Sequence, residues 1–186
     1  FADGVVTGVQ HGMQRMLAEQ RDEYWYLTLM NENYTHPEMP EGSAEGIIKG
    51  MYLLKDAGKA KKGELRVQLL GSGTILREVM AAAELLDADF GIKSDVWSCP
   101  SFVELSRDGV DAERWNRFHP EAKTPRKPWV TAQLDGRQGP AIAATDYVRH
   151  HANQIREYVP MRYSVLGTDG FGRSDTRANL RRFFEV

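Results

Sequence analysis

Three polar side chains that suit acid–base chemistry stand at alternate positions of one short segment, NENYTHP at residues 31–37. Glu32 offers a hydrogen-bond acceptor, Tyr34 a phenol and His36 an imidazole, the side chain that titrates near neutral pH. Side chains alternate between two sides of an extended backbone, so these three point the same way. The spacing predicts one wall of a site that moves protons or orients a substrate. A polar surface loop is the equally weighted alternative.

A glycine turn, LLGSGTI at residues 69–75, is the second place where chemistry could occur. It follows a predicted strand and opens a predicted helix, where backbone N–H groups can hold a phosphate group. The turn has only the first two glycines of the dinucleotide-binding pattern, because Leu76 stands at the third position, and it lacks the Walker lysine. We therefore interpret it as a tight structural turn.

A third candidate is Asp169, which follows another predicted strand in the segment GTDGFGRSD. Loops at the carboxyl ends of parallel strands commonly carry the sites of α/β proteins. The alternative is a capped turn in which Phe171 packs inward. We favour the capped turn.

The remaining ionisable residues give little sign of a metal or thiol centre. None of the five histidines has another histidine four positions away, and the adjacent His150 and His151 point about 100° apart on a helix. Cys99 is the only cysteine, which excludes an internal disulfide. Its apolar neighbours, VWSCPSF, predict a buried structural thiol rather than a nucleophile.

Composition narrows the class of protein. The 186 residues are 41% hydrophobic, which is ordinary for a globular chain of one large domain, or of one domain plus part of another. A formal net charge of −2 argues against a general nucleic-acid binder, which usually carries a basic stripe. No apolar run approaches the length of about 18 residues that a membrane-spanning helix needs.

The elements that must position these residues alternate between helices and strands. Helices are predicted at 4–19, 43–54, 74–86, 111–118 and 147–158, with a last one capped by Ser174 or Asp175. Strands are predicted at 24–30, 65–71, 94–102, 129–134, 140–145 and 163–166, and a linker or exposed turn at 56–63. This alternation predicts an α/β fold with a mostly parallel sheet sandwiched by helices.

Four segments resemble the homodimeric bacterial pyruvate dehydrogenases, the thiamine-diphosphate-dependent first component of the pyruvate dehydrogenase complex. They are NENYTHPEMPEG, VQLLGSGTILREV, SFVELSRDGVDAERWN and LGTDGFGRSDTRANLRRFFEV. The strand–GTDGFG–helix ending is similar to the closing unit of transketolase C-terminal domains. The resemblance implies that the chain is the carboxyl-terminal part of a longer polypeptide. Residues 1–40 would be the end of the pyrimidine-binding α/β domain and a linker, and residues 41–186 the transketolase-type C-terminal domain.

The resemblance also implies an activity for the parent protein. Family enzymes decarboxylate pyruvate and acetylate the lipoyl group of the dihydrolipoyl acetyltransferase. They bind thiamine diphosphate and Mg²⁺ between the two subunits of a homodimer, and we expect the parent in the cytoplasm. The family's Gly-Asp-Gly metal signature is not in this chain, which has RDG, LDG and TDG instead. We therefore expect the fragment alone to bind no cofactor and to be inactive.

Within this resemblance, the NENYTHP loop would reach the substrate channel. His36 would transfer protons or orient the substrate, Glu32 would support it by hydrogen bonding, and Tyr34 is a weaker candidate. A transketolase or another 2-oxo acid dehydrogenase is disfavoured by the SRDG–ERWN block. The alternative outside the enzymes is a stand-alone dimerisation or interaction module that has this fold and no catalytic activity.

Overall fold

The computed structural model of the chain describes residues 2–30 and 33–185. Its centre is a five-stranded sheet in the order β1-β3-β2-β4-β5. The strands are β1 Tyr52–Lys55, β2 Arg66–Gly71, β3 Lys93–Ser98, β4 Ala141–Ala144 and β5 Tyr163–Leu166. β2 pairs in parallel with β3 and β4, β4 pairs in parallel with β5, and β1 runs antiparallel to β3 at one edge. The predicted α/β class with a mostly parallel sheet is confirmed.

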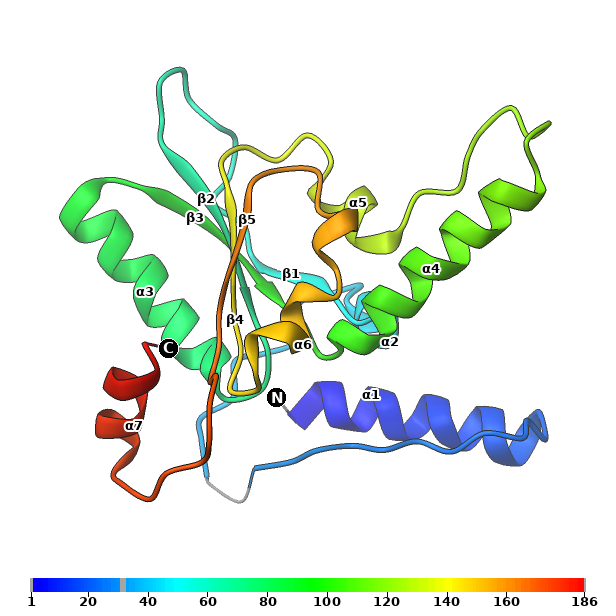
Figure 1. Cartoon of the computed structure of the whole chain (residues 1–186), viewed down its shortest axis with the longest axis horizontal. Coiled ribbons are helices and arrows are strands. Elements are labelled where there is room, and N and C mark those ends of the chain that lie inside the picture. Colours follow the sequence, from blue (N-terminus) through cyan, green and yellow to red (C-terminus); the bar gives the residue numbers. More distant parts are fainter. Residues whose placement is uncertain (1, 31–32, 186) are drawn as a thin grey trace.

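Helices cover both faces of this sheet (Figure 1). One face carries α3 (Ile75–Phe90), and the other carries α4 (Phe102–Phe118), α5 (Trp129–Leu134) and α6 (Arg149–Asn153), which the 3₁₀ turn η2 (Arg156–Tyr158) follows. Further out, α1 (Ala2–Met13) continues into the π-helical turn η1 (Gln14–Ala18) and packs on α2 (Ala44–Lys49). The last helix, α7 (Arg177–Phe184), lies near α3.

Alternation along the strands divides the core into two apolar clusters. In β2, Val67 and Leu69 belong to the cluster under α3, whereas Leu70 belongs to the cluster on the other face. The larger cluster, under α4, α5 and α6, includes Trp97, Phe102, Leu105, Val130, Leu134 and Ile155. Because helices cover both faces of the sheet, apolar side chains of the middle strands β2 and β3 are buried on either face, as is typical of parallel sheets.

A buried polar network lies beside the larger cluster, toward the amino ends of the parallel strands. The Gln68 amide nitrogen donates to Asp95 Oδ2 at 2.9 Å, and Trp97 Nε1 donates to Gln68 Oε1 at 2.9 Å. The backbone N–H of Ala57 donates to Asp95 Oδ1 at 2.8 Å, and Arg137 forms an ion pair with Asp95 at 3.4 Å. The network therefore ties the loop after β1 and the turn after α5 to the centre of the sheet.

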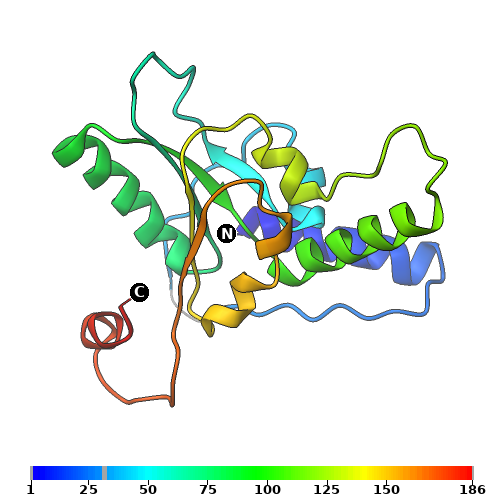
Figure 2. The same ribbon diagram turned by 45° about the horizontal axis from the view of Figure 1, so that its top comes forward.

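The predicted strand at 24–30 is wrong. This segment runs extended beside α1 (Figure 2), where Trp25 packs on Gly12 and forms an edge contact with His11 at 5.4 Å between ring centroids. Its side chains Tyr24 and Tyr26 are 88% and 83% exposed. β propensity alone does not make a strand, because each strand needs a neighbour to pair its backbone. Within the described residues no strand pairs with this segment.

The predicted strand at 129–134 is also wrong, because this segment forms α5. Val130 and Leu134 stand one helical turn apart and are both fully buried. Trp129 Nε1 donates to the carbonyl of Met51 at 2.9 Å, which fixes the start of the helix against the loop before β1. Packing outweighs the β propensity of Val130 and Thr131 here.

Several helices have other bounds than predicted. The helix expected to reach residue 54 ends at Lys49, because Gly50 adopts φ +92° and turns the chain so that Tyr52 begins β1. The helix predicted at 111–118 begins earlier, at Phe102, and the one predicted at 147–158 is split into α6 and η2. Thr176 caps α7 instead of Ser174 or Asp175, and its hydroxyl accepts from the Asn179 backbone N–H.

Candidate functional site

The predicted loop lies where α1, α3 and α7 approach one another, near the carboxyl ends of β2 and β4 (Figure 1). Its described part begins at Asn33, so Glu32 lies outside the described residues. The prolines Pro37 and Pro40 keep the loop extended until α2 begins.

His36 is exposed and contacts the start of α1. Its Nδ1 accepts a hydrogen bond from the backbone N–H of Ala2 at 3.0 Å. When Nδ1 accepts, the proton of the neutral ring is on Nε2.

Tyr34 is half-buried and contacts two other helices. The guanidinium carbon of Arg77, on α3, lies 4.5 Å from the centroid of the Tyr34 ring. Arg177 Nη1, at the start of α7, donates to the Tyr34 hydroxyl at 3.3 Å. The structure thus joins His36 and Tyr34 to different helices, although both belong to one loop.

A shallow hollow of about 230 Å³ lies between this loop and α3. It is lined by Thr35, Pro37, Arg77, Met80, Ala81 and Glu84. Drug-sized ligands usually occupy pockets of about 300–1,000 Å³, so the hollow holds at most a small group. A larger hollow of about 470 Å³ lies further along α3, where Asp87 and Lys93 contribute to its lining, and it does not include the loop.

The hydroxyl groups of the glycine turn are bonded to the loop after β4. Ser72 donates to the Thr145 hydroxyl at 3.2 Å, and Thr74 donates to the Asp146 carboxylate at 2.6 Å. Thr74 occupies the N-cap position of α3 but makes no side-chain cap hydrogen bond. These contacts are those of a structural turn that joins β2 to β4.

Asp169 is bonded to the start of α6. Its carboxylate accepts from the backbone N–H of Arg149 at 2.8 Å and from Arg149 Nε at 2.6 Å. These two hydrogen bonds, the backbone one first, hold the pKa of Asp169 below its usual value. The expectation that Phe171 packs inward is wrong, because its side chain is 95% exposed. The loop that carries it turns away from the core before α7 begins.

Cys99 and His151 are structural. Cys99 is fully buried, and burial raises the pKa of its thiol, as expected for an unreactive thiol. The His151 ring packs against Phe102 and Tyr147 at centroid distances of 5.8 and 4.7 Å, and burial lowers its pKa.

Residues 2–30 and 33–185 contain no group of three His, Cys, Asp or Glu side chains that could hold a metal ion. With the glycine-turn hydroxyls bonded to Thr145 and Asp146, the described residues do not fit a magnesium–diphosphate group. In the same part of the chain, no helix is long and apolar enough to cross a bilayer.

Sequence reasoning missed Ala2, Arg77 and Arg177, which contact the loop. Ala2 and Arg177 lie 34 and 143 residues from the loop residues that they contact. Hydrophobic periodicity carries no information about such polar contacts. The only sequence signal for Arg177 is that it follows a capping threonine at the start of a helix.

Comparison with known proteins divides the chain into two matched ranges. Residues 1–37 match the model described as the pyruvate dehydrogenase E1 component middle domain. Residues 50–186 match the model described as the transketolase-like TK C-terminal domain. Among solved structures, a transketolase from Pichia stipitis, crystallised as a complex with sedoheptulose-7-phosphate, aligns with 80% of this chain and 18% of its own, at a TM-score of 0.49 and 18% identity.

Curated relatives match over nearly the whole chain. The pyruvate dehydrogenase E1 component of Cupriavidus necator is 60% identical over 178 residues, which are 96% of this chain and 20% of that protein. The E1 components of Pseudomonas aeruginosa and Escherichia coli K12 are 59% and 52% identical over 100% of this chain, which spans 21% and 20% of their lengths. The chain thus spans about a fifth of the curated relatives that it matches. It belongs to the family of transketolase-like C-terminal domains, in the form carried by pyruvate dehydrogenase E1 components.

Proposed function

We propose that this chain is the C-terminal part of a thiamine-diphosphate-dependent pyruvate dehydrogenase of the acetyl-transferring type. The parent decarboxylates pyruvate and acetylates the lipoyl group of a dihydrolipoyl acetyltransferase. The observation that carries this proposal is the identity of 52–60%, along nearly the whole chain, with proteins named pyruvate dehydrogenase E1 component.

The proposal assigns the two parts of the chain to two domains. Residues 1–40 end a pyrimidine-binding domain and form a linker, and residues 41–186 form the C-terminal domain. The matched ranges 1–37 and 50–186 support a boundary in this region. In the parent, two such subunits form a homodimer in the cytoplasm.

His36 is the residue that we propose for proton transfer or substrate orientation. Its Nδ1 is engaged by the backbone of Ala2, which places the proton of the neutral ring on Nε2. From there the ring can donate a hydrogen bond, and during the reaction a proton, to an oxygen of the substrate. Glu32 would support the ring by hydrogen bonding, and Tyr34 remains the weaker candidate for direct contact with the substrate.

Thiamine diphosphate would supply the carbanion chemistry in the parent, while protein groups orient the substrate and move protons. The described residues do not fit this cofactor or Mg²⁺, so other parts of the parent would hold both. We therefore expect this chain alone to bind no thiamine diphosphate and to be inactive. Saturable, tight binding of thiamine diphosphate with Mg²⁺ to the chain, measured by calorimetry, would contradict that expectation.

The test uses the intact native protein that contains this chain. Pyruvate-dependent reduction of an artificial electron acceptor is measured with and without thiamine diphosphate and Mg²⁺. Activity that requires pyruvate and the cofactor supports the proposal. No turnover under any of these conditions overturns it.

One observation favours a second candidate, an interaction module without catalysis. Tyr24 and Tyr26 are 88% and 83% exposed on a segment that packs on α1 along its other side. Large exposed apolar surfaces often mark contacts with another protein. A native protein with a mass near 21.0 kDa and no pyruvate turnover would favour this candidate.

A further inference from the structure

Two helices from distant parts of the chain hold the loop that carries His36, and both do so through Tyr34. The Arg77 guanidinium of α3 covers the Tyr34 ring at 4.5 Å, and Arg177 of α7 donates to the hydroxyl at 3.3 Å. The ring contact attracts the ring face but allows rotation, whereas the hydroxyl contact fixes the direction of the ring. Together the two contacts restrain the ring and the hydroxyl of Tyr34.

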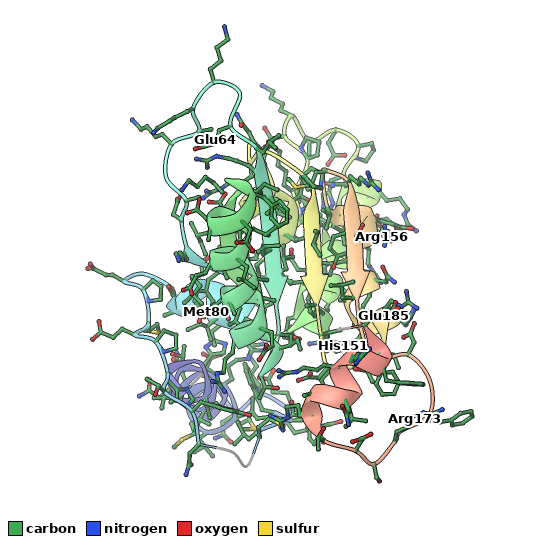
Figure 3. The ribbon with its side chains drawn as sticks, turned by 90° about the vertical axis from the view of Figure 1, so that its left-hand side faces the viewer. Glu64, Met80, His151, Arg156, Arg173 and Glu185 are labelled. Atoms are coloured by element: carbon green, nitrogen blue, oxygen red, sulfur yellow. The ribbon has the colours of Figure 1, made fainter. Side chains whose placement is uncertain are left out.

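Polar contacts also decide where α7 lies. Of the residues described in α7, none is buried, so apolar packing contributes little to its position. Arg181 of α7 forms an ion pair with Glu78 of α3 at 2.6 Å, and the Arg181 side chain is only 27% exposed. Figure 3 looks onto α3, which carries Met80, and onto α7, which is followed by its C-cap residue Glu185. The loop, α3 and α7 therefore depend on one another.

The backbone can transmit a shift of Tyr34 to His36. His36 directly precedes Pro37, and a residue before proline is confined to extended conformations. Pro37 itself has a fixed φ. The segment 34–37 has little freedom to absorb a displacement at its start, so a change at Tyr34 alters where the imidazole lies.

We propose that Tyr34, Arg77 and Arg177 form a clasp that positions His36, so that the docking of α7 sets the geometry of the candidate site. Arg77 and Arg177 act through Tyr34 and are positioning residues. The effect of the clasp on a reaction rests on the proposed function, whereas its effect on the loop does not.

The first experiment measures hydrogen–deuterium exchange in the intact native protein that contains this chain. Arg177→Gln replaces the guanidinium on α7 with a shorter, neutral amide, and Tyr34→Phe removes the phenol oxygen but keeps the ring under Arg77. We expect the amides of residues 33–36 to exchange about tenfold faster in each variant, because a restraint on local opening is lost. The effects of the two substitutions should not add in full in the double variant, because each removes the hydrogen bond between Arg177 and Tyr34.

Arg182→Gln is the matched control, because Arg182 is an exposed arginine of the same helix and the change in charge is the same. Exchange at residues 33–36 that is equal in Arg177→Gln, Tyr34→Phe and this control overturns the clasp. If Arg177→Gln does not fold, Tyr34→Phe alone decides, because it removes a single oxygen atom.

The second experiment measures steady-state turnover of pyruvate by the same variants. Arg177→Gln should lower kcat about tenfold and leave KM nearly unchanged, because the imidazole is displaced while substrate binding is kept. Arg177→Lys, which keeps a charged donor, should restore part of kcat, and Arg182→Gln should retain the original value. Unchanged kcat despite faster exchange overturns the positioning role.

The two experiments separate the two proposals. If the unsubstituted intact protein does not turn over pyruvate, the proposed function fails on that result alone. The exchange measurement still decides whether the clasp holds the loop.

Discussion

At the scale of the residue, the imidazole of His36 has two nitrogen atoms with different tasks. Nδ1 accepts from the backbone N–H of Ala2 and so fastens the loop to α1. The chemistry that we propose belongs to Nε2. A substitution that preserves one task and removes the other can therefore distinguish catalysis from loop positioning.

Asparagine at position 36 offers an oxygen near the place of Nδ1 but no ring nitrogen at the place of Nε2. We expect both His36→Ala and His36→Asn to lower turnover of pyruvate by about 10²–10⁴ in the intact protein, if His36 does acid–base work. Steady-state kinetics measures the effect. His150→Ala, which removes an exposed histidine on α6, serves as the control and should retain activity. Near-normal turnover in His36→Asn would mean that His36 only holds the loop against α1 and does no acid–base work.

Asp169 gives a prediction about pH. Its pKa is lowered in the folded chain by the hydrogen bonds from Arg149, so its contribution to the free energy of unfolding is present above the unfolded pKa of about 4. This contribution is lost as the pH falls through the lower, folded pKa. Asp169→Asn should therefore destabilise the chain at pH 7 and much less at about pH 3.

Urea unfolding of both proteins at the two pH values measures this difference. Asp89→Asn is the control, since Asp89 is exposed on α3 and has no partner in the described part of the chain. An equal loss of stability at both pH values would show that the ionised carboxylate is not what the contact requires.

At the scale of the element, the helices on the larger core face meet at unusually close range. Gly109 lies in the middle of α4, and a Cβ atom there would overlap the ring of Tyr158. The glycine weakens the helix locally but allows η2 to approach it. The close approach, more than helix propensity, explains a glycine at this position.

Gly109→Ala should lower the free energy of unfolding by about 1–3 kcal/mol, the usual cost of overpacking a core. The gain in helix propensity is at most about 1 kcal/mol and does not offset the overlap. Thermal or urea unfolding measures the change. Gly8→Ala in α1 is the control, because the nearest atom to its Cβ would be Leu27 Cδ2 at 4.0 Å, and this variant should be neutral or stabilised. Equal stability of both variants would contradict the steric argument.

The alternation of apolar segments was enough to predict the sheet class, and four of the predicted strands, β2 to β5, are present. It failed where tertiary contacts outweigh local preference. Val130 and Leu134 have the helical spacing i, i+4, but the β-branched residues beside them suggested a strand. The segment 24–30 has high β propensity but no neighbouring strand in the described chain.

The loop of the candidate site was predictable from its residue types. Its partners Arg77 and Arg177 were not, because no periodic pattern links them to Tyr34.

At the scale of the whole molecule, apolar exposure is uneven. Helices cover the two core clusters, yet the segment beside α1 exposes Tyr24, Tyr26 and Leu29. The turn η1, which continues α1, exposes Leu17. We expect this surface to associate with other chains when nothing covers it.

The chain alone should therefore self-associate as its concentration rises, as measured by sedimentation velocity. The double variant Tyr24→Ser with Tyr26→Ser should shift the association to higher concentration. Phe90→Ser with Phe118→Ser removes two exposed rings of 71% and 66% exposure from other helices, and it is the matched control. The same shift in both double variants would show that general hydrophobicity, and not this segment, drives the association.

The polar network around Asp95 has a practical consequence for handling the protein. It anchors the loop after β1 at Ala57, so the exposed residues Lys59–Lys62 beyond that anchor form a tip whose ends are already fixed. This tip lies at the opposite end of the sheet from the segment 33–40 that precedes α2 (Figure 1). A peptide tag or fluorescent label inserted there would report on the molecule without crowding the candidate site, which makes the tip the preferred point of attachment for immobilising the protein.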